Sequence, residues 1–215
     1  MILPDFSREE SLSRKGYKIV AGVDEAGRGP LAGPVVAAAV VFENSKELAK
    51  ELARMGVRDS KMVSPRKRES LYDFIVDNSR SWAAEVVSEK IIDEINILNA
   101  TKLAMKGAVE KLGVKPDFIL IDGNATLEDF AVSQLAIPRA DQYVFSVSAA
   151  SIIAKVTRDR ILLEMDEKYP GYGFSEHKGY GTKFHMDILK EKGPCEIHRK
   201  SFSPIKELFA LMGAE

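Results

Sequence analysis

The chain has little of several features that would staple a protein or place it in a membrane. Cys195 is its only cysteine among 215 residues, so no internal disulfide can form and no cysteine cluster exists for a structural zinc ion. No apolar run reaches membrane-spanning length, and the mixed charges before Gly16 differ from the apolar core of a signal peptide. We therefore expect a monomer of the reducing cytoplasm with no membrane partner.

An excess of charge of either sign is also absent, because the formal net charge is −1 at pH 7. Composition alone therefore does not indicate a nucleic-acid binder, which is often basic. Basic residues do gather in two clusters: Arg58, Lys61, Arg66, Lys67 and Arg68, then Lys155, Arg158 and Arg160. Each cluster by itself is typical of a solvated surface, and only a carboxylate site nearby would favour a role in binding.

The order of the predicted elements indicates a single α/β unit without repeats or linkers. Apolar runs predict strands over Lys18–Val23, Pro34–Phe42, Trp82–Val87, Phe118–Ile121 and Leu135–Ile137. Helical spacing and capping signals predict helices over Lys46–Met55, after Ser64 and Pro65, and over Asn96–Leu112, Val147–Lys168, Lys183–Lys192 and Pro204–Met212. A helix between the third and fourth strands indicates a crossover, so we expect three antiparallel and two parallel strands in one mixed sheet.

Acidic residues stand where apolar segments end: Asp24 with Glu25, Asp122 and Asp141. Carboxylates at strand ends can converge, and hard divalent ions such as magnesium bind a few carboxylates together with substrate phosphates. Taken singly, Asp122 before Gly123 is typical of a turn, and Asp141 of the start of a loop. Adjacent like charges at Asp24 and Glu25 are unfavourable unless they are solvated or neutralised by a cation. Consecutive strand residues point to opposite faces, so Glu25 reaches the same metal only outside the strand or through its backbone carbonyl.

A glycine-rich string begins at the acid pair and runs from Asp24 to Pro34. A bare Gly-x-Gly would be weak evidence, because it lacks the third glycine and the strand–turn–helix setting of a dinucleotide site. The whole eleven-residue string resembles the signature of the ribonuclease HII family. Further segments that are similar to this family follow in order: Asp59–Lys61, Asp122–Asn124, Asp141, Ser148–Asp159, Lys178–Thr182 and His198–Phe202. The resemblance extends from about Ile19 to Leu208.

This resemblance implies a ribonuclease H-like mixed five-stranded sheet flanked by helices, with a small C-terminal helical appendage. It implies an N-terminal extension over residues 1–16, a catalytic domain over 17–168, and a C-terminal loop and helical region over 169–215 that completes the substrate site. The implied activity is endonucleolytic hydrolysis of RNA in RNA/DNA hybrids, and cutting on the 5′ side of ribonucleotides embedded in duplex DNA. The products would carry 5′-phosphate and 3′-hydroxyl ends, and the implied cofactor is Mg²⁺ or Mn²⁺, as two ions.

Position by position, the resemblance assigns metal binding and catalysis to four carboxylates, which are Asp24, Glu25, Asp122 and Asp141. It assigns substrate binding to Gly27, Arg28 and Gly29 at the ribose 2′-hydroxyl, Tyr180 at the following deoxyribose, and Lys61 at a phosphate. Arg66, from the same basic cluster as Lys61, is a further candidate for a phosphate contact. Glycines let the backbone approach a sugar, and Arg28 offers a forked cation. Without the family, an aromatic in a Gly-rich loop such as Tyr180 is usually a packing residue.

Other polar residues receive structural interpretations. His177, His185 and His198 lack metal-ligand spacing and are predicted at the surface or in loops. Apolar residues at helical spacing after Ser203 predict a helix packed on the domain, because no glutamine opens a clamp-binding motif there.

Two alternative functions remain open from the sequence. A catalytically silent protein that binds RNA/DNA hybrids would need the basic residues but not four acids, which repel phosphate unless a metal intervenes. Another two-metal carboxylate nuclease, such as a junction resolvase, would keep the acids but have no use for a 2′-hydroxyl reader.

Overall fold

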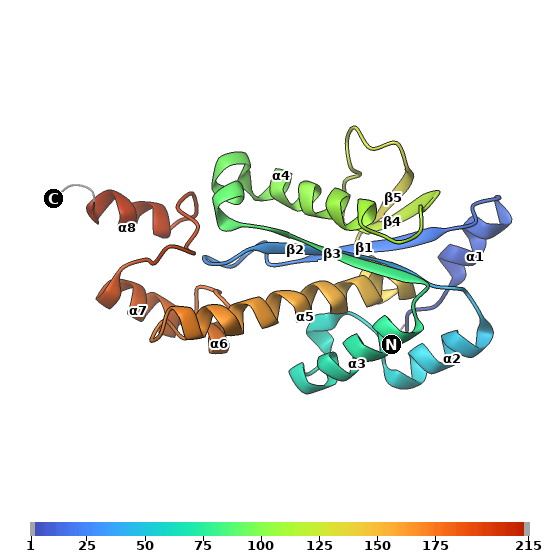
Figure 1. Ribbon diagram of the computed structural model, residues 1–215, viewed down its shortest axis with the longest axis horizontal. Helices are drawn as coiled ribbons and strands as arrows, with labels where there is room; N and C mark the ends of the chain where they lie inside the picture. The colour runs from blue at the N-terminus through green and yellow to red at the C-terminus, as the bar shows by residue number, and fades with distance from the viewer. Residues whose placement is uncertain (1–2, 213–215) are drawn as a thin grey trace.

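The computed structural model describes residues 3–212, which form one sheet covered by helices on both faces (Figure 1). The five strands are ordered β3-β2-β1-β4-β5 across the sheet. Their bounds are Val20–Ala26 (β1), Val35–Val41 (β2), Ser81–Val87 (β3), Phe118–Asp122 (β4) and Ser133–Ile137 (β5). β1 to β3 pair antiparallel, whereas β4 and β5 run parallel to β1. The predicted mixed sheet is therefore confirmed.

Helix α4 covers one face of the sheet and the long helix α5 covers the other (Figure 1). The helices are α1 (Ser7–Arg14), α2 (Lys46–Met55), α3 (Pro65–Asn78), α4 (Glu89–Glu110), α5 (Phe145–Lys168), α6 (Phe174–His177), α7 (Lys183–Lys192) and α8 (Ile205–Met212). Two short 3₁₀ helices, η1 (Ser60–Met62) and η2 (Ala140–Gln142), lie between them. Residues 1–2 of the predicted extension and 213–215 of the predicted tail lie outside the described residues.

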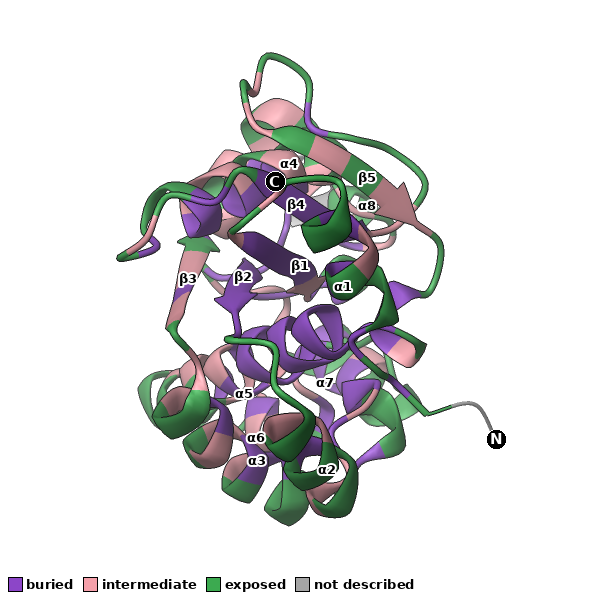
Figure 2. Cartoon of the chain, turned by 90° about the vertical axis from the view of Figure 1, so that its right-hand side faces the viewer, coloured by how far each residue is buried: buried purple, intermediate pink, exposed green. Residues whose placement is uncertain are grey.

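Side chains alternate between the two faces of the sheet along each strand, so apolar clusters form on both faces. Ala21 and Val23 of β1 pack with α4 on one face. Val36 and Ala38 of β2 lie on the other face and pack with α5. Burial is concentrated in β1, β2, β4 and the facing side of α5, with exposed residues on the outer sides of α2 and α3 (Figure 2). Burying this apolar surface is the main force that fixes α5 on the sheet.

The first turn of α5 lies directly against β1. A Cβ atom added at Gly22 would stand 2.2 Å from the backbone carbon of Ser146 and 2.3 Å from the backbone nitrogen of Val147. Only glycine fits at such an approach. Because η2 leads straight into α5, this contact brings Asp141 close to the end of β1.

The bounds that differ most from the predicted ones are the end of β1 and the start of α4. β1 runs on to Ala26, because its pairing with β2 continues past Asp24 and Glu25. α4 starts at Glu89, seven residues before the predicted start at Asn96, because the residues after Ser88 already form a helix. Asn96 has φ 66° and interrupts α4, and its side-chain oxygen accepts the N–H of Leu98. The predicted helix is thus the second of two merged segments.

The three histidines are buried, so the prediction of surface positions is wrong, although His198 does lie in a loop, between α7 and α8. His177 is 7% exposed, and His185 and His198 are fully buried. Their burial is possible because the ring nitrogens are hydrogen-bonded to one another and to the backbone, so that these polar atoms have partners away from water. Between residues 3 and 212, no helix combines the length and apolarity needed to cross a membrane.

Candidate metal centre and its surrounding loops

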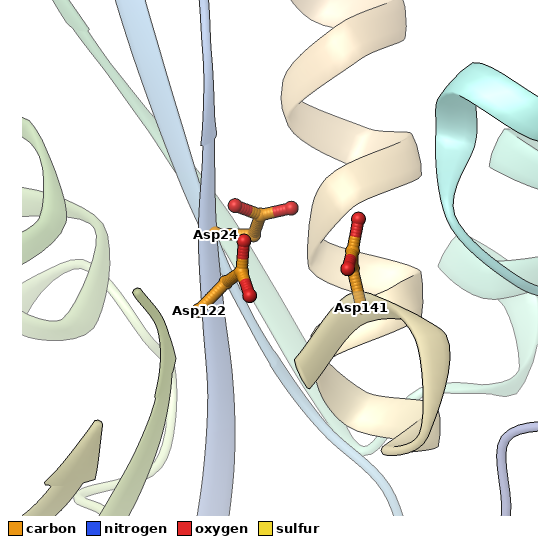
Figure 3. Close-up of side chains that lie close together, drawn as sticks. All are labelled: Asp24, Asp122 and Asp141. Carbon is orange, nitrogen blue, oxygen red and sulfur yellow. The ribbon is translucent and has the colours of Figure 1, made fainter. Parts of the chain in front are cut away.

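Three carboxylates from distant parts of the chain converge at one edge of the sheet (Figure 3). Asp24 lies near the end of β1, Asp122 ends β4, and Asp141 lies in η2. One oxygen of each lies within 4.8 Å of the others. The parallel pairing of β1 with β4 places the carboxyl ends of both strands at the same edge, as the sequence predicts.

Without a cation this arrangement is electrostatically unfavourable. Burial raises the pKa of Asp24 well above its usual range, and the charges of Glu25 and Asp122 raise it further. Burial also raises the pKa of Asp141 to about 7, with Asp122 and Asp59 adding repulsion. The pKa of Asp122 is raised by burial too, although its Oδ1 accepts the N–H of Ala140 at 2.7 Å.

The same three residues fit a divalent ion. Asp141 is 4% exposed, and within residues 3–212 its Oδ1 accepts no hydrogen bond. A buried carboxylate oxygen without a partner is unfavourable unless a cation neutralises it. Hard oxygen donors at close spacing are the ligands that Mg²⁺ and Mn²⁺ prefer. Asp24, Asp122 and Asp141 can therefore hold such an ion.

Glu25 stands apart from this group. It remains within β1 opposite Ala37, so its side chain leaves the strand on the face opposite that of Asp24. Its Oε1 lies 3.3 Å from Nη1 of Arg28, and burial raises its pKa although Arg28 opposes the rise. A second cavity, of about 160 Å³, is lined by both Glu25 and Asp122, which places the Glu25 side chain at the edge of the acidic group.

A cavity of about 500 Å³ opens at Glu25, the residue after Asp24 in β1. Its walls come from five parts of the chain, and the lining includes Glu25, Gly27, Arg28, Gly29, Lys61, Ile97, Lys155 and Tyr180. Five of the six residues predicted to bind substrate are thus brought together. Arg66 does not line this cavity, because it lies in the exposed first turn of α3. Tyr180 is 44% exposed, so its ring is not a buried packing residue.

The segment Asp59–Lys61 forms the wall nearest the acids. Oγ of Ser60 lies 3.0 Å from Oγ of Ser151, and Oδ1 of Asp59 accepts the N–H of Lys61. Burial lowers the pKa of Lys61, but Asp59 and the three clustered aspartates outweigh it, so the net change is upward. The Lys61 ammonium group, which lies beside the carboxylates, is therefore well placed to bind a phosphate.

Two buried arginines hold the glycine loop in place. Nε of Arg158 donates to the carbonyl of Pro34 at 2.9 Å, and Nη1 of Arg199 donates to the carbonyl of Arg28 at 3.0 Å. Both side chains are fully buried, and burial lowers the pKa of Arg158 to about 10 and that of Arg199 to about 9. The interpretation of Arg158 as part of a solvated surface cluster is therefore wrong, because its guanidinium binds backbone carbonyls inside the protein.

Gly27 shows why the loop contains glycine. Its φ is +100°, and a Cβ atom there would lie 2.2 Å from Nε of Arg158. Any other residue would strain the backbone and displace the arginine. Sequence reasoning did not identify Arg199, although it lies in the matching segment His198–Phe202. Arg158 carried a signal, since it lies four residues from both Ala154 and Leu162, which face the core.

Comparisons with known proteins agree with this geometry. The family model described as Ribonuclease HII matches residues 21–205. The Ribonuclease HII of Caldicellulosiruptor bescii is 50% identical over 206 residues, which cover 96% of each chain. The ribonuclease H2 from Pyrococcus horikoshii OT3 superimposes with a TM-score of 0.76 at 30% identity, covering 92% of this chain and 100% of that one.

A second solved structure is that of the RNase HII from Archaeoglobus fulgidus in a complex with PCNA. It superimposes with a TM-score of 0.74 at 28% identity, and the match covers 86% of this chain and 96% of that chain. The range of the family model includes Asp24, Asp122 and Asp141, the glycine loop and Tyr180. The chain therefore belongs to the ribonuclease HII family, and it is a metal-dependent endonuclease that cuts RNA in RNA/DNA hybrids.

Proposed function

We propose that this chain also cuts on the 5′ side of single ribonucleotides embedded in duplex DNA, using two Mg²⁺ or Mn²⁺ ions. The observation that carries this proposal is the convergence of Asp24, Asp122 and Asp141 within 4.8 Å beside a cavity walled by the glycine loop. Asp24, Asp122 and Asp141 would hold the ions, and Glu25 would join them through its backbone carbonyl or after a rotation of its side chain. A pair of such ions, when bound, stabilises the attacking water and the leaving oxygen of a phosphoryl displacement.

The residues around the carboxylates would hold the strand that is cut. Lys61 would bind a phosphate next to the acids, because its ammonium group already lies in their field. The side chain of Arg28 is 53% exposed and would bind a second phosphate with its forked guanidinium. Arg66 would meet the phosphate backbone farther along the duplex. Such contacts set the register of the substrate without reading its sequence.

Recognition of the ribose would come from the backbone of Gly27, Arg28 and Gly29. Carbonyl and N–H groups can bond a 2′-hydroxyl, which DNA lacks. Because Arg199 already binds the carbonyls of Gly27 and Arg28, these peptide groups are fixed before substrate arrives. Preorganised groups of this kind position the reacting bond at little entropic expense.

Tyr180 would recognise the sugar that follows the ribonucleotide. A Cβ atom added at Gly29 would meet Cε1 of Tyr180 at 3.9 Å, so the ring lies beside the loop, and both line the cavity. The ring can lie against a deoxyribose, whose missing 2′-oxygen leaves an apolar surface. The loop and the ring together suit a junction of one ribose and one deoxyribose.

All of these groups belong to one chain, which supports a monomer as the active unit. The reaction would take place in the cytoplasm, a reducing compartment that suits a chain with a single cysteine.

The test uses three end-labelled duplexes: all-DNA, an RNA/DNA hybrid, and DNA with one ribonucleotide. Each is incubated with and without Mg²⁺. We expect cutting of the second and third duplexes only, and only with the metal. Binding without cutting would indicate a silent binder. Cutting of the all-DNA duplex, which has no 2′-hydroxyl, would indicate another two-metal nuclease.

A further inference from the structure

A chain of hydrogen bonds between buried histidines ends at the peptide group of Tyr180. Nδ1 of His198 lies 2.9 Å from the backbone nitrogen of Cys195, and Nε2 of His198 lies 3.0 Å from Nε2 of His185. Nδ1 of His185 lies 2.9 Å from the carbonyl oxygen of Tyr180. His185 and His198 are fully buried, and the reaction proposed above uses neither of them.

The carbonyl of Tyr180 fixes the direction of the bonds in this chain. A carbonyl can only accept, so Nδ1 of His185 carries the proton and its Nε2 is an acceptor. Nε2 of His198 must then donate to Nε2 of His185, which leaves Nδ1 of His198 as an acceptor. This Nδ1 lies 3.1 Å from the carbonyl oxygen and 3.2 Å from Sγ of Cys195, and it accepts the N–H of Cys195 at 2.9 Å. Burial, together with a neighbouring histidine, lowers the pKa of each ring to about 4, so both rings are neutral near pH 7.

The third histidine holds the other side of the same segment. Nδ1 of His177 accepts the N–H of Gly179 at 3.1 Å, so its Nε2 donates to the carbonyl of Tyr172 at 2.8 Å. The rings of His177 and His185 are stacked with centroids 4.0 Å apart. The N–H of Gly179 and the carbonyl of Tyr180 are therefore hydrogen-bonded to two stacked imidazole rings, one on each side of this two-residue segment.

The backbone just before Tyr180 is also hydrogen-bonded to other parts of the chain, whereas the ring of Tyr180 is exposed. Arg158 donates to the carbonyl of Lys178 at 3.0 Å, and Leu31 donates its N–H to the carbonyl of Gly179 at 2.8 Å. The side chain of Tyr180 nevertheless remains 44% exposed at the cavity. Its orientation is thus set by the backbone beneath it rather than by packing around the ring.

We propose that His185 and His198 are positioning residues for Tyr180, which fix its carbonyl through a chain of neutral rings with one direction of proton donation. This inference rests on the proposed contact between Tyr180 and the deoxyribose. It predicts that the donor at the Nδ1 position of His185 matters for cutting at an embedded ribonucleotide, and not only the volume of the ring.

Three substitutions separate the effect of the hydrogen-bond donor at His185 from the effect of buried side-chain volume. His185→Leu removes the donor, His185→Asn keeps a donor at the position of Nδ1, and Ile188→Ala is a control that removes a buried apolar side chain from the same helix. The measured quantity is the ratio of single-turnover rates on the embedded-ribonucleotide and all-RNA hybrid substrates. Tyr180→Ala is measured in parallel.

We expect His185→Leu to lower this ratio about tenfold, since a displacement of under about 1 Å at a positioning group is sufficient for such a loss. His185→Asn should restore most of the ratio. Ile188→Ala should lower the melting temperature and leave the ratio unchanged. Affinity for the duplex should stay within about twofold in every variant, because phosphate contacts dominate it.

Equal ratios in His185→Leu and His185→Asn, or a ratio that follows melting temperature as in Ile188→Ala, would overturn the positioning role. If Tyr180→Ala lowers the ratio and His185→Leu does not, the inference fails and the proposed function stands. If Tyr180→Ala itself has no effect, the assigned role of Tyr180 fails.

Nitrogen-detected NMR of the wild-type chain provides a test that needs no variant to fold. Near pH 7, His185 should be the Nδ1–H tautomer and His198 the Nε2–H tautomer. Any other pair of tautomers would contradict the chain of bonds.

Discussion

Replacing Asp141 with Asn should make the metal-free protein more stable while it removes activity. In the wild-type chain, Oδ1 of Asp141 is buried and accepts no hydrogen bond from any described residue, and the carboxylates of Asp24 and Asp122 lie close by. Asp141→Asn keeps the shape of the side chain and removes one of the repelling charges. The remaining two carboxylates then ionise more easily.

The magnitude follows from the pKa of Asp141, which burial and then Asp122 and Asp59 raise from 3.8 to about 7. At about 1.4 kcal/mol per pH unit, ionising this group in the folded chain costs about 4 kcal/mol. Solvent screening through the adjoining cavity reduces this figure, so we expect a gain of about 2 kcal/mol above pH 7. For a chain of this size the melting temperature would rise by about 4–8 °C.

The sign of the pH dependence is fixed by the same pKa. Between about pH 4 and pH 7 the folded wild-type chain holds a proton that the unfolded chain releases, so its stability falls as the pH rises through that range. Asp141→Asn should show a weaker fall. Divalent ions at about a hundred times their dissociation constant should stabilise the wild-type chain by about 2.7 kcal/mol, and the variant much less.

The assay is thermal unfolding near pH 5 and pH 8, with Mg²⁺ and with a chelator, for both proteins. Asp159→Asn is a suitable control, because Asp159 is paired with Lys155 and lies outside the acidic group. Lower metal-free stability of Asp141→Asn near pH 8, or an equal response of both proteins to Mg²⁺, would refute the reasoning.

Four further predictions concern other parts of the site and the fold. Asp24→Asn and Asp122→Asn should each abolish most cleavage while circular dichroism stays unchanged, and near wild-type cleavage by Asp122→Asn at ordinary magnesium would exclude it as a ligand. Tyr180→Ala should reduce the single-turnover rate at an embedded ribonucleotide up to about a hundredfold and weaken duplex binding far less; equal losses of rate and affinity on all substrates would make it a general packing residue. Lys61→Ala should weaken the dependence of duplex affinity on salt concentration, and Arg66→Ala should do so to a smaller extent because Arg66 lies outside the cavity. If the slope of affinity against salt is unchanged in both variants, the basic cluster is an ordinary solvated surface. Burial raises the pKa of Glu9 from 4.5 to about 7, so Glu9→Gln should gain up to about 3 kcal/mol over the wild-type chain between about pH 5 and pH 8. Urea unfolding at the two pH values measures this gain, and a constant difference would contradict it.

The sheet and most helices could be predicted from the sequence because apolar residues mark buried faces directly. Phe118–Ile121 is an unbroken apolar run, and it forms the buried part of β4. The end of β1 could not be placed this way, because polar Asp24 and Glu25 stay in the strand through backbone pairing with β2. Pairing depends on the partner strand and leaves no local pattern.

The acidic centre was accessible to sequence reasoning for a related reason. Asp24 and Asp122 lie near the carboxyl ends of β1 and β4, which pair in parallel, so a topology argument brings them together. The position of Asp141 depends on the close approach of α5 to Gly22, which only packing reveals. The buried histidines were missed because their bonds join α6, α7 and the loop before Arg199, and no spacing along the chain records such contacts.

We expect the chain to use this acidic group to cut at a ribonucleotide, with the help of divalent ions. The most direct measurement maps, at nucleotide resolution, the cut made in a labelled DNA duplex that contains one ribonucleotide, at increasing Mg²⁺ and with a chelator. We predict a single cut on the 5′ side of the ribonucleotide, with 5′-phosphate and 3′-hydroxyl ends, that appears only with the metal and is lost in Asp122→Asn. A cut at another position, or one that persists without divalent ions or in Asp122→Asn, would contradict the account.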